Sequence, residues 1–384
     1  MKFSHLHVHT QFSLLDGAAD ISALFKKAVA DKMPAIAITD HGNMFGVFNF
    51  VAEAAKINKD NPNSIKPIIG CEFYLVADRT RRQFTKDDKD QRFHQLFLSK
   101  NEEGYHNLIK LCSHGYIDGL YGKYPRIDKE LVLKYHKGLI ATTCCLGALV
   151  PKAILKKGEA EAEKEFKWWL DLFGEDYYIE LQRHNIPDQN EVNAVLLKFA
   201  AKYNVKIIAS NDSHYVDQKD SNAHDILLCI NTGEKQSTPT IKEFADDDVM
   251  VRGKRFAFYN DQFYFKSTEE MTNLFNDVPQ AIDNTSEITD KVEPLKLKSD
   301  VLLPYFKIPS GFSDQDEYLK HITLTGAKKR YGDLMTPEIE ERINFELFTV
   351  KTMGFAGYFL IVSDFINHGR DIGVFVGPGR GSAA

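Results

Sequence analysis

The sequence lacks several features that would place the chain in a specialised class of protein. It has five cysteines in 384 residues, and this odd, small number argues against a disulfide framework. No apolar run approaches the roughly 20 residues that a membrane-spanning helix needs. The first residues also lack the basic-then-apolar pattern of a signal peptide. These absences predict a cytoplasmic protein that does not contact a membrane.

Positive charge is also in short supply. The chain has 48 lysines and arginines against 54 aspartates and glutamates, which gives a formal net charge of −6. Such a chain has no bulk attraction to nucleic acid, so any contact with DNA must come from a local site or from parts outside this sequence. With 43% hydrophobic and 27% charged residues, the composition is typical of a globular protein with a sizeable core. The length favours one large domain plus a smaller one.

What the sequence does contain is a regular alternation of β-rich and helical segments. Apolar residues at helical spacing occupy, for example, 20–33, 104–117 and 187–204. Alternation of this kind predicts parallel strands joined by crossover helices, and seven strands suggest a closed or nearly closed barrel. The seven β-rich runs are 2–8, 35–39, 66–76, 93–99, 138–143, 176–181 and 206–210.

The pattern changes beyond about residue 235. Residues 267–292 predict two helices, each opened by Ser or Thr with a Glu nearby, close to a capping-box pattern. The segment 293–314 has several prolines and no clear period, which is typical of a linker. Two further helices are predicted at 316–332 and 337–355, followed by a glycine-rich end.

Polar side chains with metal-binding chemistry follow four of the predicted strands. In a parallel α/β barrel the carboxyl ends of the strands share one face, so residues distant in sequence are expected to converge there. The residues in question are His7, His9, Asp40, His41, Cys144, Cys145, Asp212 and His214.

The three histidines of "HLHVHT" share one face of the first strand, so they could be ligands or stacked core side chains. The pair His7 and His9 stands at the strand end before an acidic turn, which favours a pair of ligands. His5 lies further from the end, and we interpret it as a core residue.

Two further positions, His41 and Glu72, favour a metal site over ordinary core packing. Asp40 could simply cap the following helix, whereas His41 has no such role. Glu72 lies in the middle of an apolar strand, where a carboxylate is costly to bury unless it is paired or binds a cation. We interpret Glu72 as a ligand that bridges two metals.

A site with several metals suits phosphoester hydrolysis, because paired cations polarise the phosphate and generate hydroxide near neutral pH. Histidine and cysteine favour zinc, whereas carboxylates also accept manganese. The residues leave the identity of the metal open.

At these residues the sequence resembles the PHP family of polymerases and histidinol phosphatases. The resemblance implies an α/β fold, a distorted, TIM-like, seven-stranded β/α barrel with two or three divalent metals, which could be zinc, manganese or iron. It assigns nine ligands to positions in this sequence: His7, His9, Asp16, His41, Glu72, His94, Cys145, Asp212 and His214.

The family pattern also divides these ligands among three metals. It implies one metal at His7, His9, Glu72 and Asp212, a second at Glu72, His94 and Cys145, and a third at Asp16, His41 and His214. We expect the four residues of the first set to be the catalytic ones. Asp16 and His94 rest on the resemblance alone, since one is a turn residue and the other begins its strand. The "C-L-x-G" context selects Cys145 and leaves Cys144 as a packed thiol.

A second resemblance covers nearly the whole chain. The stretch "MGFAGYFLIVSDFINHGRDIGVFVGPGRGSAA" resembles the opening of the polymerase core in the alpha subunits of bacterial replicative DNA polymerase III, and "KMPAIAITDHGNMFG" resembles their PHP domain. The strings "GYHNLIKLCS", "ASNDSHYV" and "FYFKSTEEM" extend the match. The resemblance implies a PHP domain over residues 1–290, and a linker with the beginning of an incomplete α/β polymerase palm over residues 291–384.

The glycine-rich end would then face the triphosphate of an incoming deoxynucleotide. Glycines let the backbone approach a phosphate, and an arginine supplies a charged fork. Alone the string is weak, because it is not the Walker pattern and could be an ordinary loop. The family's magnesium-binding carboxylates lie further along, so we expect an N-terminal part of a larger polymerase that does not itself synthesise DNA. The expected nucleotide contacts are Gly377, Gly379, Arg380, Gly381 and Ser382.

The leading functional hypothesis is a replicative DNA polymerase whose PHP domain is a proofreading 3′ to 5′ exonuclease. The implied partners are the 3′ primer end of DNA, deoxynucleotides, the sliding clamp, the clamp loader and a proofreading exonuclease subunit. An alternative is a catalytically silent PHP domain whose metals are structural and which supports the palm or a partner exonuclease. A small-molecule phosphatase is a weaker alternative, because it has no use for a palm.

Overall fold

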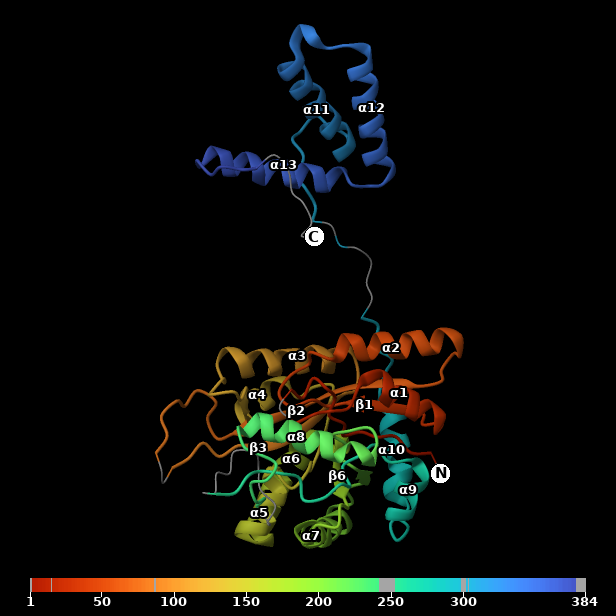
Figure 1. The fold of residues 1–384 in the computed structure, drawn as a ribbon, viewed down its shortest axis with the longest axis vertical. Helices are drawn as coiled ribbons and strands as arrows, with labels where there is room; N and C mark the ends of the chain where they lie inside the picture. Colours follow the sequence, from red (N-terminus) through yellow and green to blue (C-terminus); the bar gives the residue numbers. More distant parts are fainter. Residues whose placement is uncertain are drawn as a thin grey trace. The chain divides into compact units, whose positions relative to one another are not determined.

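The computed structural model describes residues 2–14, 16–85, 88–241, 253–297, 302 and 304–377. The chain forms two compact units, Met1–Leu297 and Lys298–Ala384 (Figure 1). The sequence placed a boundary after residue 290, which is inside the last helix of the first unit; the division between the units falls seven residues later.

The first unit is built around one seven-stranded sheet surrounded by helices (Figure 1). Neighbouring strands follow the order β1-β2-β3-β5-β6-β7, and β4 pairs with β2. The predicted α/β class with a sheet of seven strands is confirmed. The strands are β1 (Ala35–Ile38), β2 (Lys66–Val76), β3 (Phe93–Ser99), β4 (Arg126–Asp128), β5 (Leu139–Thr142), β6 (Tyr177–Gln182) and β7 (Ile207–Ser210).

The helices of the first unit bury one apolar face each. In α1, for example, Ile21, Leu24, Phe25 and Ala28 are buried at the spacing of an amphipathic helix. The helices are α1 (Ile21–Ala30), α2 (Val47–Asp60), α3 (Glu102–Ile117), α4 (Lys129–Tyr135), α5 (Leu149–Lys157), α6 (Glu159–Phe173), α7 (Pro187–Tyr203), α8 (Ser221–Thr232), α9 (Thr268–Leu274) and α10 (Gln280–Lys291).

The prediction of uniformly parallel strands was wrong for β3. This strand is antiparallel to both of its neighbours, β2 and β5, whereas the other pairs are parallel. The described part of the connection from β2 to β3 contains no helix, so the chain turns back beside β2 instead of crossing over. The amino end of β3 therefore lies beside the carboxyl ends of the parallel strands.

The first predicted strand, residues 2–8, is not one of the seven strands, and the short strand β4 was not predicted. The amino-terminal segment instead makes isolated parallel bridges, from His5 to Ile36 in β1 and from Val8 to Ser213 just after β7. The His5 carbonyl accepts from Ala37 N at 2.9 Å, and His9 N donates to the Ser213 carbonyl at 2.8 Å. The segment thus links the two ends of the sheet.

One face of the sheet changes from apolar to polar along the strands. An apolar cluster includes Ile68, Leu98, Tyr178 and Ile208, one residue from each of four strands, and Ile288 and Val292 at the end of α10 pack into it. Because side chains two residues apart share a face, the same faces continue to functional groups. The pairs within strands are Ile68 with Glu72, Leu98 with His94 and Tyr178 with Glu180.

The helices predicted over residues 267–292 differ in how they begin. Ser267 and Glu270 form the expected capping box at the start of α9. In contrast, α10 begins after Pro279 and not after a Ser or Thr, so that part of the prediction was wrong. Proline suits the first turn of a helix because its missing N–H has no partner there anyway.

The second unit consists of helices in its described residues. They are α11 (Gln315–Tyr331), α12 (Pro337–Thr352) and α13 (Ala356–Asp371), with a small core of Leu319, Ala356 and Leu360. Residues 302 and 304–377 contain no strand, whereas an α/β segment was expected. Across the described chain, no single helix is long and apolar enough to cross a membrane; only α12 and α13 together reach that composition, and they are bent by 112°.

Candidate metal centre

All nine side chains predicted as ligands converge on one site in the first unit. The antiparallel direction of β3 explains how His94, at the start of its strand, reaches residues at the ends of the parallel strands. His7 and His9 come from the amino-terminal segment, Asp16 from the turn after it, His41 from the end of β1, Glu72 from β2, Cys145 from the loop after β5, and Asp212 and His214 from the segment after β7.

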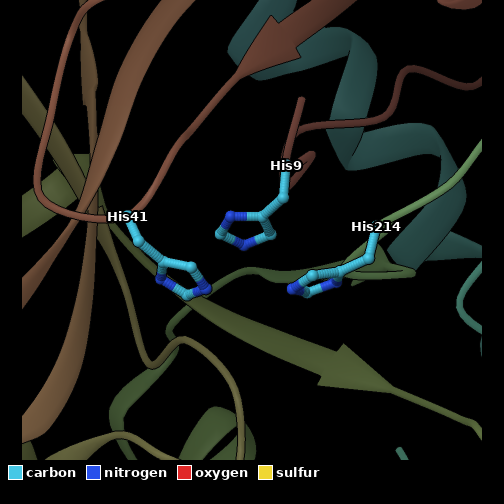
Figure 2. A group of neighbouring side chains, drawn as sticks. All are labelled: His9, His41 and His214. Atoms are coloured by element: carbon cyan, nitrogen blue, oxygen red, sulfur yellow. The ribbon is translucent and has the colours of Figure 1, made fainter. Parts of the chain in front are cut away.

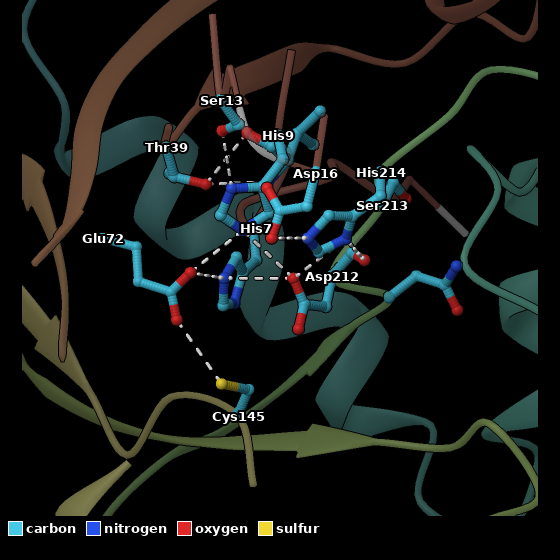
Figure 3. Close-up of polar contacts among 12 residues, drawn as sticks. His7, His9, Ser13, Asp16, Thr39, Glu72, Cys145, Asp212, Ser213 and His214 are labelled. Carbon is cyan, nitrogen blue, oxygen red and sulfur yellow. Dashed lines mark hydrogen bonds and ion pairs between the residues drawn. The ribbon is translucent and has the colours of Figure 1, made fainter. Parts of the chain in front are cut away.

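Glu72 contacts several of the other predicted ligands and is only 1% exposed; Figure 3 shows its carboxylate between the histidines and Cys145. Its Oε2 atom lies 3.2 Å from His7 Nε2, 3.0 Å from His9 Nε2 and 3.1 Å from His41 Nδ1. Its Oε1 atom faces the other way and lies 2.9 Å from His94 Nδ1. A carboxylate whose two oxygens face different sets of nitrogens has the geometry of a bridging ligand.

The four ligands of the first predicted set form one compact group. His7, His9, Glu72 and Asp212 each offer one ligand atom, and all four atoms lie within 4.8 Å of one another. Asp212 Oδ1 is 3.3 Å from His7 Nε2 and 3.2 Å from His9 Nε2. Two imidazoles and two carboxylates are a suitable four-ligand set for zinc or another borderline metal.

The second predicted set also comes together, with one addition. Cys145 Sγ is 3.4 Å from Glu72 Oε1 and 3.4 Å from His94 Nδ1. Cys144, interpreted from the sequence as a packed thiol, is equally near, with its Sγ 3.2 Å from Glu72 Oε1. Cys145 also contacts His94 and so has two neighbours within the predicted set, which makes it the better candidate.

The third predicted set, Asp16, His41 and His214, lies beside the His9 ring. Asp16 Oδ2 is 3.1 Å from His41 Nε2 and 3.8 Å from His214 Nε2. Figure 2 shows the three rings of His9, His41 and His214 together; the His9 ring stacks on His41 at 4.1 Å and on His214 at 4.2 Å between centroids. Ligand atoms of these three histidines also lie within 4.8 Å of one another.

Several ligand atoms at this site have no hydrogen-bond partner although they are buried. Three of them, His9 Nε2, His41 Nδ1 and Asp212 Oδ1, lie 3.0–3.2 Å from another predicted ligand atom, as expected of groups that point at a common ion. Leaving a polar atom unpaired in the interior costs about 1–3 kcal/mol. A bound cation would satisfy these atoms together, so the residues fit a metal centre. The atoms are His9 Nε2, Asp16 Oδ1, His41 Nδ1 and Asp212 Oδ1.

Comparisons with known proteins find similarity in an amino-terminal and a carboxyl-terminal stretch of the chain. Residues 5–184 match the PHP domain, and residues 317–384 match the bacterial DNA polymerase III alpha NTPase domain. The DNA polymerase III subunit alpha of Borreliella burgdorferi is 45% identical over 100% of this chain and 32% of its own length. The corresponding subunits of Treponema pallidum and Thermus aquaticus are 39% and 37% identical, over 31% and 35% of their lengths.

The chain belongs to the family of bacterial DNA polymerase III alpha subunits. It spans about a third of the length of these relatives. Asp212 and His214 lie beyond the stretch that matches the PHP domain, yet they join the same cluster in space.

Two solved structures match part of the chain at low identity and low TM-score. One, assigned as a metal-dependent phosphoesterase from Bifidobacterium adolescentis, has 15% identity and a TM-score of 0.33 over 56% of this chain and 88% of that one. The other, an amidohydrolase from Chromobacterium violaceum with bound sulfate, has 14% identity and a TM-score of 0.37 over 55% and 87%. These likenesses concern the fold alone.

The charged groups of the candidate metal centre shift one another's pKa values. Burial alone would lower the pKa of His7, but Asp212, Glu180 and Glu72 raise it well above its ordinary value. The pKa values of His41 and His94 are raised in the same way by neighbouring acidic groups. In contrast, burial and the nearby His9 lower the pKa of His214 to about 3. Without cations, this cluster therefore holds protons on some of its histidines.

One buried carboxylate of the site, Glu180, was not predicted from the sequence. It contacts the ring nitrogen of His7 that faces away from Glu72 and Asp212. His7 Nδ1 donates to Glu180 Oε1 at 2.7 Å, which leaves His7 Nε2 facing Glu72 and Asp212. Thr142 and Ser210 also donate to Glu180, each at 2.6 Å. A carboxylate behind a ligating histidine fixes its tautomer and orientation. The signal was available, since Glu180 interrupts the apolar run "DYYIEL" as Glu72 interrupts its own strand.

Two residues outside the ligand set have structural roles. Asp40 does not cap α2, which begins at Val47, so that interpretation was wrong. Its buried carboxylate accepts from Thr10 N at 2.6 Å, Thr10 Oγ1 at 2.8 Å and Ser13 Oγ at 2.8 Å, and Ser13 Oγ lies 3.1 Å from His9 Nδ1. His5 bonds to the Lys266 carbonyl at 2.8 Å, away from the cluster, as expected of a core residue.

A pocket gives access to the centre. Six of the nine predicted ligands line it, together with aromatic and apolar side chains. None of the described residues that line it is a lysine or arginine. The lining consists of Asp16, His41, Tyr74, His94, Cys145, Leu146, Gln182, Ile186, Gln189, Asp212, His214, Ile241, Phe256, Ala257, Phe258, Tyr259 and Phe263.

The predicted nucleotide contacts belong to the second unit. Gly377 is exposed, at the end of its described residues. The other predicted contacts, Gly379, Arg380, Gly381 and Ser382, lie outside the described residues.

Proposed function

We propose that the PHP metal centre hydrolyses phosphodiester bonds at the 3′ end of DNA and so acts as a metal-dependent 3′ to 5′ exonuclease. The observation that carries the proposal is the convergence of all nine candidate ligands, with unpaired ligand atoms, beside a pocket that six of them line. A site that only stabilised the fold would not need access from a pocket.

Two or three divalent cations, such as zinc, manganese or iron, would supply polarisation of the phosphate and activation of water. The protein's part is to position them. Glu72 links the predicted sets because its two oxygens face different groups, and Asp212 and the two histidines of the amino-terminal segment complete the first set. Glu180 holds the His7 ring in the orientation that presents Nε2.

The charged residues that line the pocket also favour binding of a phosphate through metal ions over binding by protein side chains alone. Asp16 and Asp212 line the pocket, and its described lining contains no cationic side chain other than histidine. Once the histidines are deprotonated to act as metal ligands, the carboxylates would repel a DNA phosphate unless bound cations neutralised them. A chain with a net charge of −6 can thus take an anionic substrate through a local metal centre.

The test uses the purified chain, manganese or zinc, and single-stranded DNA labelled at its 3′ end. We expect release of the label, and a loss of at least about a hundredfold in rate for Asp212→Asn, since removal of a ligand charge disables the first set. Asp171→Asn, an exposed aspartate on α6, is the matched control and should keep full activity. Intact label with the parent chain, or equal rates for Asp212→Asn and the parent, would contradict the proposal.

A catalytically silent centre with structural metals is the competing function. It is favoured by the way the cluster ties together segments from both ends of the first unit, from His7 to His214. In that case chelation would lower the melting temperature while no nuclease activity would appear with any metal. The family of the chain disfavours a small-molecule phosphatase.

For the whole protein of which such a chain forms part, we propose DNA-directed DNA polymerase activity in replication. The glycine-rich segment from Gly377 to Ser382 would bind the triphosphate of a deoxynucleotide in the palm, with magnesium at the polymerase site. The proposed partners are the 3′ primer end, the sliding clamp, the clamp loader and a proofreading exonuclease subunit. The similarity to alpha subunits over the full chain supports this proposal.

A further inference from the structure

One side of the pocket beside the metal centre is built from aromatic rings. We define the aromatic wall as Phe256, Phe258, Tyr259 and Phe263, all of which line the pocket. The Phe258 ring meets the His214 ring edge-on at 4.7 Å between centroids, and packs against Phe263 at 4.5 Å. The aromatic wall thus begins directly at the third set of predicted ligands.

The outer part of the aromatic wall is available to a ligand. Tyr259 is 46% exposed and Phe256 is partly exposed, whereas Phe263 is buried. A planar group that entered beside the cations would therefore find ring faces and edges on this side. Ile186 and Leu146 add apolar surface to the pocket.

The two amide side chains in the pocket are already engaged by the protein. Gln182 Nε2 donates to Glu180 Oε1 at 3.0 Å, and Gln189 Oε1 accepts from His184 N at 2.7 Å. These bonds hold the amides in place and leave few groups to read the edge of a base by hydrogen bonding. Stacking on aromatic rings binds every base, because every base has a π-face.

We infer that the aromatic wall binds the base of the terminal nucleotide by stacking, with little preference among the four bases, while the adjacent phosphate lies at the metal centre. The inference rests on the proposed function, and it names the part of the substrate that the pocket recognises. A base seated there cannot at the same time be paired with a template strand. The site would therefore take unpaired 3′ ends.

The test compares two single-stranded oligodeoxynucleotides, one ending in an ordinary nucleotide and one ending in an abasic tetrahydrofuran residue. Tyr259→Ala should lower kcat/KM for the base-ended substrate by about tenfold and leave the abasic-ended substrate unchanged. Tyr259→Phe should retain the parent value because the ring remains. Phe48→Ala, which removes a 67% exposed ring on α2 outside the pocket, is the control and should change neither value.

The four terminal bases should give similar values with the parent chain. Equal rates for Tyr259→Ala and the parent on the base-ended substrate, or an equal loss on both substrates, would overturn the inference. A strong preference for one base would do the same.

A parent chain that cleaves neither substrate would refute the proposed exonuclease but not decide the inference, so a binding measurement follows. Calorimetry with the manganese-loaded chain compares deoxyadenosine monophosphate with 2-deoxyribose 5-phosphate. The inference holds if the nucleotide binds about tenfold more tightly and Tyr259→Ala removes that difference. Equal affinities for the two ligands would overturn it.

Discussion

The ring of His7 and the carboxylate of Glu180 are joined by a hydrogen bond of 2.7 Å, and both side chains are fully inaccessible to solvent. In the neutral ring that a metal needs, this contact keeps the proton on Nδ1 and so leaves Nε2 to bind a cation. Four segments of the first unit contribute to the arrangement, because Thr142 and Ser210 also bond to Glu180.

We expect Glu180→Gln to weaken metal binding by about 10- to 100-fold, because an amide holds the His7 ring less firmly and removes a negative charge behind it. Metal titration followed by elemental analysis would measure the effect. Glu159→Gln, which alters an exposed carboxylate paired with Lys198, is the matched control. Unchanged metal affinity in Glu180→Gln would show that His7 does not depend on this contact.

The two adjacent thiols can be told apart by spectroscopy. With cobalt in place of the native metal, a thiolate ligand gives a characteristic charge-transfer absorption. We expect Cys145→Ser to abolish this band and Cys144→Ser to keep it, because Cys145 contacts both Glu72 and His94. Loss of the band in Cys144→Ser alone would reverse the assignment.

The stability of the metal-free chain should fall as the pH rises from about 6.5 to 8. His7, His41 and His94 have pKa values raised in the folded state, above the value of about 6.5 for an unfolded chain. Their contribution to stability is fully present below that value and is lost as the pH rises through the folded pKa. Metal binding needs deprotonated ligands and strengthens over the same range.

The measurement for this prediction is the melting temperature of the chelated and the manganese-loaded chain across that pH range. We expect the difference between the two to widen with pH. A constant difference would mean that these histidines do not bind the metal.

Asp40→Ala should lower the free energy of unfolding by about 3 kcal/mol, because Thr10 N and two hydroxyls lose a buried acceptor. Asp20→Ala removes an exposed helix cap at α1 and should cost about 1 kcal/mol. Urea unfolding of both metal-loaded variants would test the comparison. A loss in Asp40→Ala no greater than in Asp20→Ala would contradict the role given to this carboxylate.

The amino-acid pattern was informative where ligands follow parallel strands. The pairs His7 with His9 and Asp212 with His214 could be found from spacing, since alternate residues share a face and strand ends share an edge. His94 could not, because its position depends on the reversed direction of β3, and the segment before β3 reads simply as a loop. Asp16 was equally hidden, since its turn reaches the cluster only through the fold around it.

Other residues were misjudged for physical reasons that the structure makes clear. Residues 2–8 have the composition of a β-strand, but they form isolated bridges and not a continuous strand pairing. Aspartate is a favoured helix-capping residue, but the Asp40 carboxylate instead accepts hydrogen bonds from Thr10 and Ser13, in a turn that is distant in sequence. The role of Glu180 was predictable from the sequence, because a lone carboxylate in an apolar strand must find buried hydrogen-bond donors.

The bridging position of the amino-terminal segment has a consequence for biosynthesis. His7 and His9 leave the ribosome well before their partners Asp212 and His214, which emerge only when the first unit is nearly complete. Contacts between such distant parts of a chain form late and slowly during folding. The full ligand set cannot assemble on a short nascent chain, so metal uptake should mark the completion of this unit rather than begin its folding.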